Sequence, residues 1–199
     1  MNKSKKIKYN SLAGKFLISS PGINDVRFKN TIIYVLSDNE EGSMGIIINK
    51  PALNINISSI LEDKELKTNK KNINEPKVFY GGPVELDKGF IIHTNDYKKS
   101  KKITLLENGL VLSSNISIIK DIINGSGPSK SLFAIGYSGW DRHQLKMEVN
   151  QNAWLEVELD ISILFSTNHK RKWSYGMSKL GINSSLLKKA VFPPCSGSA

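Results

Sequence analysis

Short apolar runs separated by turn-forming residues predict that the chain begins with strands. Phe16 to Ser19 and Thr31 to Asp38 are rich in β-branched and aromatic residues, and Pro21-Gly22 lies between them, which is typical of two strands joined by a loop. The next apolar run, Gly45 to Asn49, follows a turn-forming stretch and stops before Pro51. Since proline lacks the backbone donor of a strand, the run should end there and form a hairpin with the run before it.

Further strands and two helices are predicted in the middle of the chain. The strands are expected at Lys77 to Tyr80, Gly89 to Thr94, Ile103 to Leu106 and Leu110 to Ser113, where β-branched and aromatic residues again dominate. Ser58 to Leu66 has the composition of a short helix, and residues 67–74, rich in lysine and asparagine, are typical of a loop. Isoleucines recur at helical spacing from Ile116 to Ile123 and Gly125 follows, which predicts a second helix that covers the sheet.

The segment after this helix continues with a strand, a helix and another strand. Leu132 to Tyr137 is predicted as a buried strand. Asp141 and Gln144 have the spacing of a helix N-cap and its reciprocal partner, so a helix should start there and run to about Asn150. Ala153 to Leu159 alternates between apolar and polar residues, with Trp154 on the polar side, which predicts a strand with one solvated face.

The order of these elements favours one α+β domain with a mixed sheet. A last helix is expected from about Lys170 to Leu180, before Gly181. Strands and helices interleave irregularly, and neither an internal repeat nor a long linker divides the chain. With 199 residues, 39% of them hydrophobic, the chain can build one sizeable core. We expect a basic flexible tail over residues 1–12, a single domain over 13–183 and a flexible tail over 184–199.

The net charge of +10 raises the question of a nucleic-acid partner, because clustered cations gain affinity by releasing counterions from phosphates. Most of the cations are lysines, whereas arginine, which makes forked contacts to phosphates and bases, occurs only at Arg27, Arg142 and Arg171. The predicted helices are separated by strands, so no helix-turn-helix is expected. The distribution favours a solvated lysine surface and leaves open an acidic partner or weak, non-specific contacts with nucleic acid.

The apolar runs and the cysteine usage predict a cytoplasmic protein without a membrane partner. Every apolar run is far shorter than the ~20 residues that cross a bilayer. The basic start is not followed by the apolar stretch of ~7 to 15 residues that a secretory signal needs. Cys195 is the lone cysteine, so no internal disulfide is expected, as in a reducing compartment.

The motifs that could carry catalysis or bind a cofactor are incomplete. Gly125 to Ser131 lacks the spacing of a phosphate-binding loop and joins a predicted helix to a strand, the reverse of the usual order. Gly136 to Trp140 lies where a nucleophile elbow would, but Trp140 replaces the last glycine of GxSxG. Ser138, with His143 as its base, is therefore a weak candidate without an acidic partner. The alternative is a tight turn in which Trp140 packs in the core.

Metal binding is not expected from the sequence. His93, His143 and His169 are scattered, and no HxxxH, HExxH or CxxC spacing occurs. A lone histidine is more often a hydrogen-bonded structural residue than a ligand. We therefore expect neither a metal nor another cofactor.

Four ordered segments of the chain resemble the YqgE/AlgH family of bacterial proteins: Gly14 to Pro51, Phe79 to Thr94, Leu132 to Leu145 and Asn152 to Phe165. The most specific parts are NEEGSMGIIINKP, GGPV followed by GFIIHT, and GYSGW followed by QL and NAWL. The resemblance implies a mixed, strongly curved sheet or partial β-barrel flanked by helices. It implies no catalytic residue, and one branch of the family is described as regulating transcription of exopolysaccharide synthesis. Ser138 stands where the family commonly has alanine, which argues further against chemistry at this serine.

Three hypotheses about function follow. The first is a non-enzymatic binding or regulatory protein, with an unidentified ligand or protein partner held in a groove at the strand ends, where a rigid sheet positions loops. Its candidate residues are Asn49, Gly81, Gly82, Pro83, His93, Tyr137, Gly139, Trp140 and Gln144. The second is an enzyme with a pocket around His93 and Tyr137. The third is an accessory factor that contacts RNA or DNA through its lysines.

Overall fold

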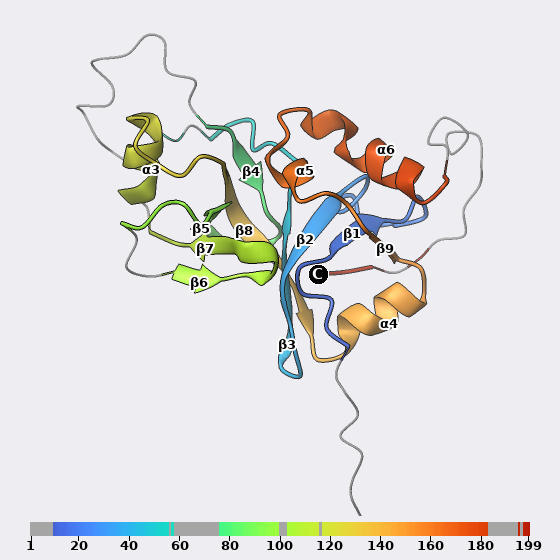
Figure 1. Cartoon of the computed structure of the whole chain (residues 1–199). Coiled ribbons are helices and arrows are strands. Elements are labelled where there is room, and N and C mark those ends of the chain that lie inside the picture. The colour runs from blue at the N-terminus through green and yellow to red at the C-terminus, as the bar shows by residue number, and fades with distance from the viewer. Residues whose placement is uncertain are drawn as a thin grey trace, which may run out of the picture.

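The structure is a computed structural model that describes residues 10–55, 57, 76–99, 103–115, 117–182, 195 and 197–199. Within these residues nine strands form one sheet in the order β6-β7-β5-β8-β3-β2-β1-β9, with β4 beside β8 (Figure 1). The strands are β1 Phe16–Ser19, β2 Ile32–Asp38, β3 Gly42–Ile47, β4 Val78–Tyr80, β5 Val84–Thr94, β6 Ile103–Leu105, β7 Leu110–Ser113, β8 Ser131–Asp141 and β9 Trp154–Val157. The helices are the 3₁₀ turn η1 Glu107–Gly109, α3 Ser117–Ile123, α4 Gln144–Asn150, α5 Ser162–Phe165 and α6 His169–Lys179.

Strand β8 joins the two halves of the sheet. Its first half pairs with β5 in antiparallel and β4 in parallel orientation, and its second half pairs with β3. Gly136, at the change of partner, has a φ of 65°, a left-handed conformation that glycine adopts without strain. The expected α+β domain with a mixed, strongly curved sheet is confirmed. The alternative of a tight turn at Gly136 to Trp140 is wrong, because β8 continues through these residues to Asp141.

The inner face of the curved sheet carries the largest apolar core. Alternate residues of β1 and β2 point inward, among them Ile18, Ile32 and Tyr34, and they pack with Leu164 of α5 and Met177 of α6. In Figure 1 these two helices lie together over one side of the sheet. Helices α5 and α6 therefore close the inner core.

Both halves of the outer face of the sheet are covered as well. Ile118 and Ile119 of α3 pack on the half that contains β5. Leu145 of α4 packs on the other half, against Trp140 and Trp154. Because both faces are buried, most of β1 and β2 is a continuous apolar run, residues 16–18 and 32–36, as in strands that lack a solvated side.

Most elements predicted from the sequence are present, including the β2–β3 hairpin, α3 and α6. The N-cap of α4 is His143 in a left-handed conformation rather than Asp141, although Gln144 does accept a hydrogen bond from the Asp141 N–H at 2.9 Å. The placement of Trp154 on a solvated face was wrong, because α4 covers that end of β9 and the indole is fully buried. The predicted helix Ser58 to Leu66 and the loop 67–74 lie outside the described residues.

The last residues of the chain lie against the domain. The Cys195 N–H donates to the carbonyl of Gly22 at 3.1 Å, and the Ser198 N–H donates to Glu148 at 3.1 Å. The sequence predicted a flexible tail over 184–199, whereas Cys195 and residues 197–199 make specific contacts. Among the described helices, none combines the length and the apolar character needed to cross a membrane.

Candidate functional site

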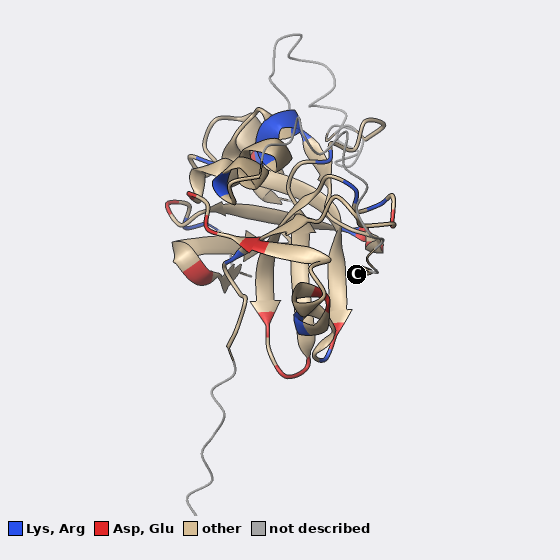
Figure 2. Ribbon diagram, turned by 90° about the vertical axis from the view of Figure 1, so that its right-hand side faces the viewer, with Lys and Arg blue, Asp and Glu red and all other residues tan. Residues whose placement is uncertain are grey.

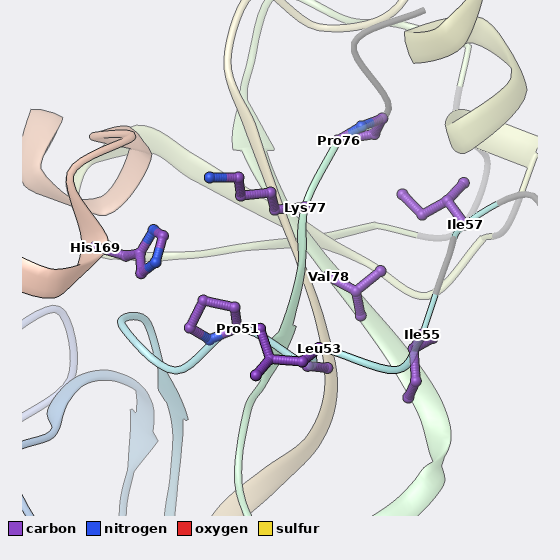
Figure 3. Close-up of a pocket in the computed structure, with 9 residues that line it drawn as sticks. Pro51, Leu53, Ile55, Ile57, Pro76, Lys77, Val78 and His169 are labelled. Atoms are coloured by element: carbon purple, nitrogen blue, oxygen red, sulfur yellow. The ribbon is translucent and has the colours of Figure 1, made fainter.

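A pocket of about 260 Å³ opens between the segment that follows β3, the start of β4 and the start of α6 (Figure 3). Nine described residues line it: Pro51, Ala52, Leu53, Ile55, Ile57, Pro76, Lys77, Val78 and His169. Seven of them are apolar and the other two are basic. In Figure 3, His169 and the Lys77 ammonium lie toward one end of the pocket, and Ile55 and Ile57 lie toward the other.

Backbone hydrogen bonds hold the floor of this pocket. The Ala52 N–H donates to the Val78 carbonyl at 2.9 Å, and the Tyr80 N–H donates to the Lys50 carbonyl at 2.8 Å. Pro51 therefore pairs with Phe79 in an antiparallel bridge, although proline itself cannot donate. Leu53, which lines the rim of the pocket, is 89% exposed. An apolar side chain is therefore exposed to solvent at the edge of an apolar pocket.

The basic end of the pocket is formed by His169 and Lys77. His169 begins α6, its Nδ1 lies 3.2 Å from the Thr167 carbonyl oxygen, and its ring packs edge-on to Phe79 at 6.1 Å. Partial burial lowers the pKa of His169, and the positive charges of Lys77 and two lysines of α6 lower it further. None of the described lining residues is acidic. An anion bound there would meet attraction from this end of the pocket.

The exposed cations of α6, Lys170 and Arg171, follow directly after His169 at this end of the pocket. The helix sequence begins His169-Lys170-Arg171-Lys172 and its first turn contains no acidic residue, an arrangement that the helix dipole disfavours. Figure 2 shows basic residues on α6, while acidic residues gather at the opposite end of the domain, around the turn between β2 and β3. Exposed positive charge on the first turn of α6 therefore lies next to the basic end of the pocket.

Two of the residues predicted from the sequence, Trp140 and Gln144, lie in one network around Glu148. Trp140 Nε1 donates to Glu148 Oε2 at 3.0 Å, and Gln144 Nε2 donates to Glu148 Oε1 at 2.9 Å. Trp140 is 4% exposed. These side chains form a hydrogen-bonded group, buried at Trp140 and Glu148 and half-buried at Gln144, beside Ser198.

Five others come together where β8 changes partner. A Cβ on Gly82 would lie 2.2 Å from the Tyr137 carbonyl carbon, and one on Gly139 would lie 3.2 Å from the Tyr137 ring. Gly81 is equally tight, because its Cβ would lie 2.2 Å from the Gly136 oxygen. The half-buried Pro83 follows Gly82. The three glycines therefore permit close backbone packing in this region.

Asn49 and His93 lie apart from both groups. Asn49 accepts from the Ile32 N–H at 2.9 Å and donates to the Asn30 carbonyl at 2.8 Å. His93 is fully buried; its Nδ1 donates to the Thr94 carbonyl at 2.7 Å, and its Nε2 has no partner among the described residues. None of the nine predicted residues lines the pocket, and a groove shared by all of them stays a prediction.

The sequence contains one signal for the pocket, and it lies at the start of α6. His169 is far from the other histidines in the sequence, so a search for histidine pairs misses it. It is, however, the first of four consecutive basic residues at the start of a helix, where cations are normally avoided. The apolar walls give no such signal, because their residues look like ordinary core positions. No cluster of three or more metal-binding side chains occurs in the described parts of the chain.

Ser138→Ala is expected to change the free energy of unfolding by about 1 kcal/mol or less. Ser138 is fully buried in β8 and its hydroxyl makes one long bond, 3.3 Å, to the Gly81 carbonyl. A serine-directed fluorophosphonate should not label the wild-type chain, because the hydroxyl is inaccessible. Labelling that disappears in Ser138→Ala would show instead that this serine is a nucleophile.

Comparison with known proteins identifies the family. A family model described as AlgH-like matches residues 16–185. A UPF0301 protein of Ruegeria pomeroyi is 37% identical over 180 residues, which cover 90% of this chain and 97% of that protein. A UPF0301 protein of Bradyrhizobium diazoefficiens is 34% identical over 182 residues, covering 88% of this chain and 85% of that one.

Solved structures agree with the sequence comparisons. The solution structure of the AlgH protein from Pseudomonas aeruginosa superposes with a TM-score of 0.71 and 33% identity, covering 96% of this chain and 99% of that one. A crystal structure of a protein from Corynebacterium diphtheriae, with a TM-score of 0.68 and 15% identity over 90% of this chain and 92% of that one, shares the fold. Because the family model and its relatives match nearly the whole chain, the protein belongs to the YqgE/AlgH family.

Proposed function

We propose that this chain is a non-enzymatic binding protein whose pocket between Pro51, Val78 and His169 takes a small ligand with an apolar body and an anionic head group. The observation that carries the proposal is the composition of the pocket: seven apolar residues, two basic residues and no acidic one among its described lining. Apolar walls with a few placed polar groups are the usual form of a ligand site. At about 260 Å³ the pocket suits a ligand smaller than a typical drug.

The depressed pKa of His169 supports an anionic head group. The imidazole is held in an environment that disfavours its charged form, through burial and through neighbouring cations. An anion in the pocket would offset both effects and raise the pKa of His169. Ligand binding and protonation of His169 should then favour each other, since coupling between two binding events is reciprocal.

A non-enzymatic role is supported by the chemistry of the lining. Neither a serine, a cysteine nor a carboxylate is among the described residues of the pocket, so His169 has no nucleophile to activate there. The resemblance to a branch described as transcriptional regulators favours a regulatory use of ligand binding. The lone cysteine is consistent with a place in the cytoplasm.

Sodium hexanoate is expected to bind in this pocket and to bind more tightly as the pH falls. At about pH 6 the amide signals of Ala52, Leu53 and Val78 should shift in an NMR titration, and the pKa of His169 should rise in the complex. A charge pair at ~4 Å in water is worth about 1 kcal/mol, so the affinity should increase about fivefold as His169 becomes protonated. His169→Ala should abolish this pH dependence, and Lys77→Gln should weaken binding several-fold.

The matched controls separate this site from general charge attraction. Lys179 lies on the same helix ten residues after His169, about 15 Å along its axis, and Lys179→Gln should leave hexanoate binding unchanged. Hexylamine, with the same apolar body and the opposite charge, should bind much more weakly than hexanoate. Equal binding of the two compounds, or shifts confined to another part of the molecule, would refute the proposed ligand chemistry.

A further inference from the structure

A second site is built around the buried carboxylate of Glu148 on α4. Glu148 is 6% exposed. Its Oε2 accepts from the indole N–H groups of Trp140 at 3.0 Å and Trp154 at 2.7 Å. Its Oε1 accepts from Gln144 Nε2 at 2.9 Å and from the backbone N–H of Ser198 at 3.1 Å. Three of the four donors thus belong to the folded domain, and the fourth comes from the segment that lies on it.

Gln144 and Glu148 together hold Ser198 by its backbone. While Glu148 accepts from the Ser198 N–H, Gln144 Nε2 donates to the Ser198 carbonyl oxygen at 2.7 Å. Gln144 is itself oriented by the Asp141 N–H, which donates to its Oε1 at 2.9 Å. A pair of side chains that binds one N–H and one C=O recognises an extended backbone and requires little of the side chain between them.

The neighbouring contacts also suit an extended segment with small residues. Cys195 pairs with Ile23 in a parallel bridge, and its N–H donates to the Gly22 carbonyl at 3.1 Å. A Cβ on Gly197 would lie 2.9 Å from Ile23 Cδ1 and 3.2 Å from the Ala153 Cβ. A side chain at this position would have to displace the end of Ile23 and crowd Ala153, so the site favours glycine here. The adjacent residue, Ser198, is held mainly through its backbone N–H and C=O.

The residues that form the site lie within the range of the AlgH-like family model, whereas the segment bound to them lies after it. Trp140, Gln144, Glu148 and Trp154 all lie within residues 16–185, which the AlgH-like family model matches, whereas Cys195 and residues 197–199 follow that range. Cys195 and Ala199 pack against the outer core, but such small side chains bury little apolar area, so this segment gains little from the hydrophobic effect. A segment held mainly by a few hydrogen bonds opens at a lower free energy than the core beneath it.

We propose that Gln144 and Glu148 form a peptide-binding clamp that Cys195 and residues 197–199 occupy in cis, and that an extended segment of a partner polypeptide binds there by displacing them. The partner segment has a free backbone N–H and C=O at the clamped residue and a glycine immediately before it. The occupied clamp is the closed state of the site, and the partner competes with the chain's own segment for one set of hydrogen bonds.

Deleting residues 195–199 is the direct test, with the peptide Cys-Ser-Gly-Ser-Ala as the probe. The chain has three tryptophans, and their indole N–H signals report the outcome by NMR. The signals of Trp140 and Trp154 should move on deletion and return when the peptide is added. Trp173, whose Nε1 donates to the Ser19 carbonyl at 3.1 Å, should stay unchanged. Since a tethered segment has an effective concentration of about mM, it competes with added peptide, and the peptide should bind the full-length chain several-fold more weakly than it binds the shortened chain.

Two altered peptides control for the geometry of the clamp. A peptide with Ser198→Pro lacks the donated N–H, and one with Gly197→Val meets Ile23; neither should restore the indole signals of the shortened chain. If deletion unfolds the protein, Gly197→Val in the full-length chain keeps the site and expels the segment, and this variant should then bind the unaltered peptide. Failure of the unaltered peptide to bind both the shortened chain and the Gly197→Val variant would overturn the proposal, as would equal binding of all three peptides.

Discussion

Trp154→Ala is expected to lower the free energy of unfolding by about 3–5 kcal/mol, the usual cost of removing a large aromatic side chain from a core. Trp154 is fully buried. Its ring packs edge-on to Phe28 at 5.5 Å and to Trp140 at 5.9 Å. Its Nε1 donates to Glu148 at 2.7 Å, so the substitution also removes one donor from a buried carboxylate, which adds to the cost.

Urea denaturation of three variants measures this effect and separates its causes. Trp154→Phe keeps most of the aromatic volume and removes the N–H, so its loss should be smaller than that of Trp154→Ala. Trp173 is only partly buried, and Trp173→Ala should cost less than Trp154→Ala. A loss below about 1 kcal/mol for Trp154→Ala would mean that the site collapses around the missing ring.

The second large effect is expected at Lys172, in the form of a pH dependence. Lys172 is 1% exposed. Its ammonium donates to the carbonyls of Ile48 at 3.1 Å and Leu164 at 2.9 Å, and lies 5.6 Å from the centre of the Phe79 ring. Burial lowers its pKa to about 8. The residue thus ties α6 to α5 and to the end of β3, at the cost of removing a charge from water.

Wild type should gain stability relative to Lys172→Met as the pH rises above about 8. The unfolded chain, with a lysine pKa near 10.5, binds the proton more tightly than the folded chain does. Protonation therefore favours unfolding: the penalty is fully present below the folded pKa and disappears as the pH approaches the unfolded one. The difference in unfolding free energy between the two proteins should shift by about 2 kcal/mol between about pH 7 and pH 10.

Denaturant titrations at both pH values check this, because other titrating groups are common to the two proteins and cancel. Lys179→Met is the control, since Lys179 is exposed near the end of the same helix. Its stability relative to wild type should change little with pH. A wild-type advantage that falls as the pH rises would show that the Lys172 ammonium is stabilised by its surroundings instead of penalised.

The strands could be predicted from the sequence because their local amino-acid composition alone indicates that they are buried. Residues 16–18 and 32–36 are apolar on both faces, so these parts of β1 and β2 are buried in any register. The face of Trp154 could not be predicted this way. Its burial depends on α4, which packs across β9, and periodicity within one strand does not show which helix covers it. The turn expected at Gly136 to Trp140 was wrong for a similar reason, because glycine favours a bulged strand as readily as a turn.

The candidate site was harder to predict than the fold, because its residues come from distant parts of the chain. Pro51, Val78 and His169 meet only after the sheet has closed and α6 has docked. Polar residues at strand ends were a reasonable guide to ligand contacts. For Asn49, however, the structure shows two hydrogen bonds to backbone groups, a structural use that the residue type does not distinguish from ligand binding.

The position of β8 has a consequence for how the chain folds during synthesis. Strands β3 and β5 are complete by residue 94, but both need β8, residues 131–141, as a neighbour. One edge of β1 likewise stays unpaired until β9 has been synthesised, since Phe16 pairs with Val157. Pairings over such separations are slow to form and leave strand edges open in the meantime. The nascent chain therefore exposes its most apolar strands until the last quarter has been made, and general chaperones should engage it during that interval.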